Sequence, residues 1–143
     1  MRKAPLLLRV TAVITLLFAV GHTLGGMHSW SPAGETEVLK AMRTFHFDAE
    51  GASRSYLDFY RGFGFLLSTH MLLEGILLWQ LAPLAQVNAK QVRPMIAAIF
   101  LASVAGAILS WEFIFSLPVA FFSLTAVLLA ASYVATYRIE VAR

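Results

Sequence analysis

The sequence predicts an all-α protein: a four-helix transmembrane bundle with a short amphipathic helix in the long loop between the first and second helices. Of its 143 residues, 59% are hydrophobic and only 13% are charged, whereas a soluble domain usually carries roughly 25% charged residues. Four runs reach the length of about 20 apolar residues that a spanning helix needs, at 5–25, 62–82, 94–113 and 117–136. We therefore expect residues 1–143 to form a single integral membrane domain.

The first run follows Met1-Arg2-Lys3, which is the kind of basic start that a secretory signal peptide has. It ends in Gly21-His22-Thr23-Leu24-Gly25-Gly26, without the small-x-small pattern of a cleavage site. We expect it to be retained as the first spanning helix.

The loop between the first two spans, residues 27–61, is polar but patterned. Four of its apolar residues recur at helical spacing: Val38, Leu39, Met42 and Phe45. Charged residues occupy the opposite face. The pattern predicts a short amphipathic helix that either lies on the outer membrane surface or closes over the bundle. Gly51 marks a turn, and we expect the second long helix to start at Ser53.

Two spans carry small residues four positions apart, a spacing that lets another helix approach closely. The first span has Gly21 and Gly25. The third span has a longer stripe, formed by Ala98, Ala102, Gly106 and Ser110. Packing within the bundle is the first interpretation, and a homodimer contact is the alternative.

The net charge of +3 is unevenly distributed between the two sides of a four-span arrangement. Seven basic residues fall on one side: Arg2, Lys3, Arg9, Lys90, Arg93, Arg138 and Arg143. The positive-inside rule therefore places both termini and the connector at 83–93 in the cytoplasm, with 27–61 outside. Basic residues scattered at helix ends are topology signals and do not indicate a nucleic-acid partner. Three tryptophans near span ends, Trp30, Trp79 and Trp111, fit the aromatic belt of a membrane protein.

Several kinds of chemistry are excluded or disfavoured by the residues themselves. The absence of cysteine rules out iron–sulfur clusters, dithiol chemistry and thiol nucleophiles. His22 and His70 have different expected depths, which argues against a haem held between them. No histidine or acid pair has zinc-ligand spacing. We predict neither a metal site nor a cofactor.

The strongest candidate for chemistry is His70 with Glu74, four residues apart and so one turn apart on one helix face. Charged groups inside a membrane span are costly and mark functional sites by default. If they face the bundle interior, the two can hold and pass a proton, which is general acid–base work. The alternatives are a buried polar pair that only fixes packing, and a metal ligand pair.

A second group of candidates lies nearer the outer surface. His22 and Glu112 have similar expected depths near the outer ends of the first and third spans, and Trp111 beside Glu112 could steady a cation. Asp58, Tyr60 and Arg61 would form the rim of a cavity mouth. Asp58 and Arg61, with Arg54, share one helix face, so a solvated ion network is the simpler interpretation of that rim.

The run His70-x-x-x-Glu74-Gly75, early in a span of a four-helix membrane protein, resembles the emopamil-binding (EXPERA) family. That family includes sterol isomerases and sigma-type ligand-binding proteins, in which a histidine and an acid on one helix work with an acid on another. The resemblance implies proton transfer around a sterol double bond, with His70 and Glu74 as matched positions and Glu112 as the looser candidate for the partner acid.

A longer stretch looks like a family of small bacterial four-helix membrane proteins without an established activity. It comprises Gly21-His22-Thr23 and the run from Arg54-Ser55-Tyr56-Leu57-Asp58 to Phe59-Tyr60-Arg61-Gly62-Phe63-Gly64. This resemblance implies the fold and a multi-pass location in the bacterial inner (plasma) membrane.

Together these observations predict an integral membrane protein with an intramembrane polar site for an apolar or amphipathic molecule such as a sterol-like lipid, isoprenoid or quinone. A proton-transfer isomerase is the enzymatic version, with His70, Glu74 and Glu112 as catalytic residues. His22, Asp58, Tyr60, Arg61 and Trp111 are then the predicted ligand-binding residues. The alternative is a non-enzymatic lipid- or ligand-binding protein or a small subunit of a membrane complex, and a dimeric transporter ranks third.

Overall fold

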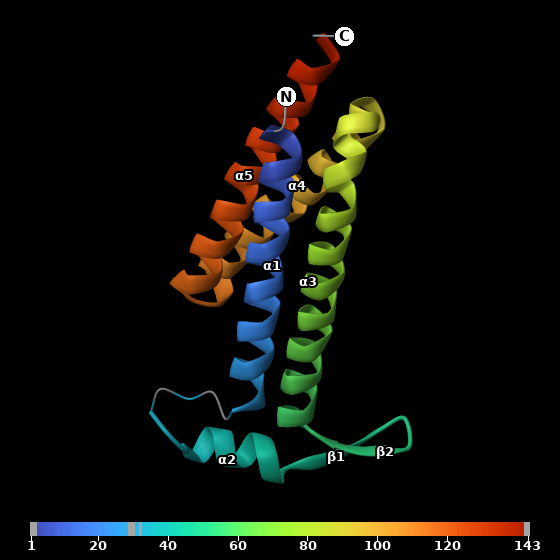
Figure 1. Cartoon of the computed structure of the whole chain (residues 1–143). Helices are drawn as coiled ribbons and strands as arrows, with labels where there is room; N and C mark the ends of the chain where they lie inside the picture. The colour runs from blue at the N-terminus through green and yellow to red at the C-terminus, as the bar shows by residue number, and fades with distance from the viewer. Residues whose placement is uncertain (1–2, 29–30, 32, 142–143) are drawn as a thin grey trace. The chain divides into compact units, whose positions relative to one another are not determined.

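The computed structural model describes residues 3–28, 31 and 33–141, and it confirms the all-α class. Along the chain the elements are α1 (Lys3–Met27), α2 (Glu37–Thr44), β1 (His46–Ala49), β2 (Ala52–Ser55), α3 (Tyr56–Val87), α4 (Ala89–Phe113) and α5 (Ser116–Val141) (Figure 1). Four helices, α1, α3, α4 and α5, are long and apolar enough to cross a membrane. Four residues named above, Met1, Arg2, Trp30 and Arg143, lie outside the described residues.

The chain divides into two compact units, and α1 and α3 each contribute one part to each unit. One unit comprises residues 1–17 with 73–143, and the other comprises residues 18–72. The first unit therefore holds the start of α1, the end of α3 and all of α4 and α5. The second holds the end of α1, the segment with α2 and the two strands, and the start of α3.

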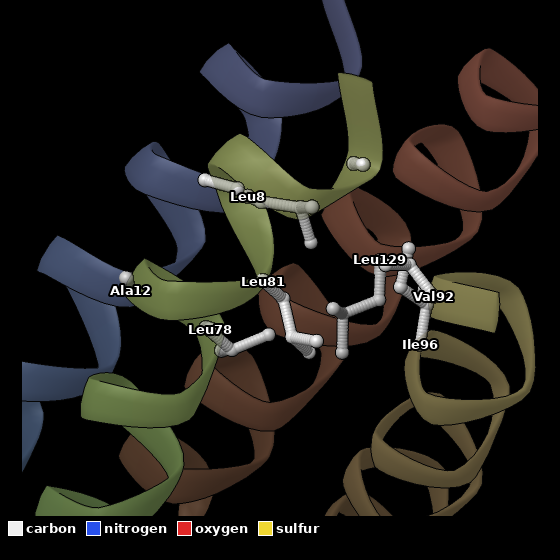
Figure 2. Packing of buried hydrophobic residues seen from close by; sticks show 9 residues of the cluster. Leu8, Ala12, Leu78, Leu81, Val92, Ile96 and Leu129 are labelled. Atoms are coloured by element: carbon white, nitrogen blue, oxygen red, sulfur yellow. The ribbon is translucent and has the colours of Figure 1, made fainter. Parts of the chain in front are cut away.

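The first unit has a core of aliphatic side chains drawn from all four of its helical segments (Figure 2). Its buried members are Leu8, Ala12, Leu78, Leu81, Ala82, Ala85, Val92, Ile96 and Leu129. Three of these members, Ala12, Ala82 and Ala85, are small, and small side chains let helix backbones come close together. The same effect joins α4 to α5, where a Cβ added at Gly106 would lie 2.9 Å from the Phe122 ring. This part of the predicted stripe therefore packs inside the bundle.

The connector predicted at 83–93 is almost wholly helical. α3 continues to Val87 and α4 begins at Ala89, so Asn88 alone separates them. The Asn88 side chain accepts a hydrogen bond from the Gln91 amide at 3.3 Å and so caps the new helix. Pro83 and Pro94 lie inside the helices on either side of this link.

In the second unit, α2 is the predicted amphipathic helix. Thr36 caps it by accepting a hydrogen bond from the Leu39 amide at 3.2 Å, and Leu39 is buried. Its charged face carries an exposed ion pair between Arg43 and Glu35 at 3.2 Å.

The antiparallel hairpin that follows α2 was not predicted. Its turn requires positive φ at Glu50 (54°) and Gly51 (87°), and Asp48 accepts a hydrogen bond from the Gly51 amide at 2.9 Å. Ser53 pairs with Asp48 in this hairpin, so the second spanning helix begins three residues later than expected, at Tyr56. The Phe47 ring packs on Tyr56, with 4.9 Å between ring centroids, and on Phe59, with 5.6 Å. These rings join the hairpin to the start of α3.

Candidate functional site

Glu74 lies in the part of α3 that belongs to the first unit, and its side chain is half-buried. No described residue donates a hydrogen bond to its carboxyl group or forms an ion pair with it. An acid in a membrane span that lacks a protein partner must be protonated or must bind something else, since hydrocarbon solvates charge poorly. Glu74 is therefore the strongest site candidate that the sequence named.

The backbone beside Glu74 is held by a close helix contact. Gly75 is buried, and a Cβ added there would lie 2.7 Å from Leu16 Cγ and Cδ2 and 3.4 Å from the carbonyl oxygen of Ala12. Only glycine allows α3 to approach α1 this closely. The fixed backbone at Gly75 in turn fixes the position from which the Glu74 side chain extends.

His22 and Ser68 form a polar contact between α1 and α3 within the second unit. The Nδ1 atom of His22 lies 2.9 Å from Ser68 Oγ, and Ser68 Oγ lies 3.2 Å from the carbonyl oxygen of Gly64. If the single hydroxyl proton is donated to Gly64, His22 donates from Nδ1, and its Nε2 atom is then an acceptor. His22 is half-buried, with the Phe18 ring centroid 6.3 Å away.

Ser68 was not singled out from the sequence, although a signal for it exists. Along α3 the residues Gly64, Ser68, Met71 and Gly75 recur at helical spacing, and all four are buried or half-buried. A stripe of mostly small residues on one face predicts the side that packs against another helix. That stripe would have placed Ser68 on the side of α3 that packs against another helix.

His70 lies on the surface of its unit. Its side chain is exposed, and its Nδ1 atom lies 2.8 Å from the carbonyl oxygen of Leu66, one turn earlier on the same helix. A hydrogen bond donated from Nδ1 would leave Nε2 as an acceptor directed elsewhere. The joint role of His70 and Glu74 in proton transfer stays a prediction.

Asp58, one of the three residues predicted to form the rim of a cavity, is part of the cap at the start of α3. Its Oδ2 atom accepts hydrogen bonds from the Ser55 amide at 2.8 Å and the Ser55 hydroxyl at 2.9 Å, and Ser55 Oγ accepts from the Asp58 amide at 3.2 Å. This reciprocal pair caps the start of α3. Tyr60 is exposed and Arg61 is half-buried. A ligand role for Asp58, Tyr60 and Arg61 stays a prediction.

Trp111 and Glu112 lie in the last turn of α4 and are both exposed; the Trp111 side chain is 78% accessible. An indole ring this exposed can stabilise a cationic intermediate only if substrate, lipid or another chain covers it. In the described ranges 3–28, 31 and 33–141, no three His, Cys, Asp or Glu side chains converge as a metal site.

Comparisons with protein-family models, with curated proteins and with solved structures found no match to the chain. The two family resemblances therefore depend on their sequence motifs alone.

Proposed function

We propose that this membrane protein binds an apolar or amphipathic small molecule within the bilayer, with the Glu74 carboxyl group as the polar anchor. The observation that supports the proposal is that Glu74 is half-buried in a spanning helix and has no partner among the described residues. A polar group placed in apolar surroundings without a hydrogen bond costs about 1–3 kcal/mol by mutational measurements. A ligand whose hydroxyl or amine group donates to the carboxylate, or whose carbonyl group accepts from the protonated acid, would remove that cost.

The surroundings of Glu74 favour a ligand with a long apolar body. Leu73, Ile76 and Leu77 on the same stretch of α3 are 53%, 42% and 43% exposed. These side chains offer a hydrocarbon surface beside a single carboxyl group. Sterol-like lipids, isoprenoids and quinones have this combination of a small polar end and a large apolar body.

Proton-transfer isomerisation is the enzymatic form of this proposal. A protonated Glu74 would donate its proton to one carbon of a double bond, and a base would then remove a proton from a neighbouring carbon. The double bond is shifted, the proton count is unchanged, and no oxidant or cofactor is consumed. His70 and Glu112 are the groups in the sequence that could serve as the second proton site.

The test is mass spectrometry of molecules that co-purify in mild detergent with the wild-type protein, with Glu74→Gln and with Glu37→Gln, which removes an exposed acid on α2, as the control. We expect a stoichiometric isoprenoid, sterol-like or quinone ligand in the wild type and in Glu37→Gln, and its loss from Glu74→Gln. Bulk phospholipid alone in all three samples would contradict the proposal. Circular dichroism of each variant checks that the helices remain.

The non-enzymatic alternative, a subunit of a membrane complex, is favoured by the exposed end of α4. Trp111 at 78% exposure and Phe113 at 74% leave an aromatic surface for another chain. Cross-linking in native membranes tests it. A cross-linked partner that depends on Trp111, together with no ligand on Glu74, would favour the subunit role.

We further propose a bacterial inner-membrane location with both termini in the cytoplasm. The distribution of basic residues and the positive-inside rule support this orientation. Reporter fusions at residue 143 and within 31–35 test it: a cytoplasmic reporter should be active only at the first position, and a periplasmic reporter only at the second.

A further inference from the structure

A pocket of about 290 Å³ lies in the first unit, between the start of α1 and the end of α3. Its lining residues are Pro5, Leu6, Arg9, Pro83 and Gln86. α1 begins at Lys3 and α3 ends at Val87, so at a rise of 1.5 Å per residue these positions lie within about 9 Å of a helix end. Side chains this close to the end of a spanning helix can reach the headgroup region of a bilayer.

Arg9 is the charged group of this pocket, and its side chain is exposed. The guanidinium carbon lies 5.4 Å from the centroid of the Trp79 ring, which supports its plane by a cation–π contact. Within the described residues, Arg9 makes no hydrogen bond and no ion pair. Its N–H donors are therefore available to an anion, although the ring already restricts the orientation of the group.

We propose that this pocket binds the phosphate group of an anionic phospholipid. A guanidinium group donates two parallel hydrogen bonds to phosphate oxygens, and a charge near the bilayer boundary gains from an anionic partner. Gln86 adds a polar side chain to the lining, and Leu6 and the two prolines add apolar contacts. The volume suits a headgroup, with the acyl chains continuing along the outside of the helices.

The site is independent of the proposed role of Glu74, because no lining residue belongs to that site. The positive-inside rule also places it in the cytoplasmic leaflet, where anionic lipids are abundant. A phosphate ligand at this depth would hold the start of α1 against the end of α3 as well as neutralise Arg9.

Native mass spectrometry of the full chain tests the site, with titration of phosphatidylglycerol, of phosphatidylcholine and of inorganic phosphate. Three variants are compared with the wild type. Arg9→Gln removes the charge, Leu6→Trp fills the pocket and keeps the charge, and Lys90→Gln removes a charge from an exposed position outside the pocket. We expect phosphatidylglycerol to bind about tenfold more weakly to the first two variants, since a tenfold change corresponds to about 1.4 kcal/mol, the scale of one charge-assisted hydrogen bond. Lys90→Gln should bind as the wild type does.

Wild-type affinity in both Arg9→Gln and Leu6→Trp would overturn the proposal. An equal loss in Lys90→Gln would also overturn it, because binding would then follow net surface charge. Displacement of the lipid by inorganic phosphate would overturn the lipid as the source and identify the free anion as the ligand of Arg9. The two pocket variants act by different means, so a folding defect in one leaves the other as the test.

Discussion

Replacing Gly75 with alanine should destabilise the protein even though alanine is the better helix former. The added Cβ would lie 2.7 Å from Leu16 Cγ and Cδ2 and 3.4 Å from the Ala12 carbonyl oxygen. The Ala12 carbonyl is part of the backbone, and Leu16 Cγ is only two bonds from its own backbone, so neither atom moves away easily. Overpacking costs about 1–3 kcal/mol, while alanine gains about 1 kcal/mol over glycine in a helix interior. The net expectation is a loss of about 1 kcal/mol.

Gly62→Ala on the same helix is the matched control, because a Cβ there meets no atom within 4 Å. It should gain up to about 1 kcal/mol, so the two variants should differ by the overpacking cost of about 1–3 kcal/mol. Unfolding by sodium dodecyl sulfate in mixed micelles, followed by circular dichroism, measures both. If Gly75→Ala is as stable as Gly62→Ala, the close contact of α1 with α3 beside Glu74 is wrong.

Three further predictions concern the second unit. A double-mutant cycle of His22→Phe and Ser68→Ala should give a coupling free energy of about 0.6 kcal/mol, the mean for polar contacts between helices in membranes. A coupling free energy of zero would contradict the contact between the two side chains. Ser55→Ala should cost about 1 kcal/mol and speed hydrogen exchange in the first turn of α3; unchanged exchange would contradict the cap. Because the chain has no cysteine, a single introduced cysteine can carry a spin label at any chosen position. If the half-buried face of the hairpin, which carries Phe47 and Ala49, lies on lipid, a label at Ala49→Cys should be more accessible to oxygen and one at Asp48→Cys more accessible to a water-soluble relaxation agent; equal accessibility would refute this.

The four spanning helices and α2 could be predicted because each depends on a property that is local in sequence. A bilayer requires long apolar runs, and an amphipathic face shows as helical spacing. The hairpin was missed because its strands have four residues each and depend on the turn at Glu50 and Gly51, where Glu50 is not a residue type that signals positive φ.

The helical connector was missed for a different reason. Pro83 and Pro94 normally mark helix ends, yet both lie inside helices within about a turn and a half of Asn88. The reversal of the chain therefore needs only one non-helical residue, and its signal is the capping amide of Asn88. A capping residue indicates where a helix starts. A proline close to a helix end does not indicate whether it lies inside the helix or beyond it.

The site was only partly predictable because spacing tells which residues share a helix face but not which way that face points. His22 contacts Ser68 on another helix, whereas His70 is exposed and its Nδ1 atom lies near the Leu66 carbonyl oxygen of the same helix. The missing information was the position of the contact face of α3. Small residues such as Gly64 and Gly75 provide it, because helices in a membrane associate through close packing.

Polar groups inside the spans differ in whether a hydrogen bond within the same helix satisfies them. Hydroxyl groups such as those of Thr11, Ser103 and Ser132 donate to a backbone carbonyl four residues earlier, so they are satisfied locally and need no other helix or ligand. Glu74 and Arg9 make no such hydrogen bond within the described residues. The proposed ligand at Glu74 and the proposed phosphate at Arg9 would each supply the partner that the described chain does not.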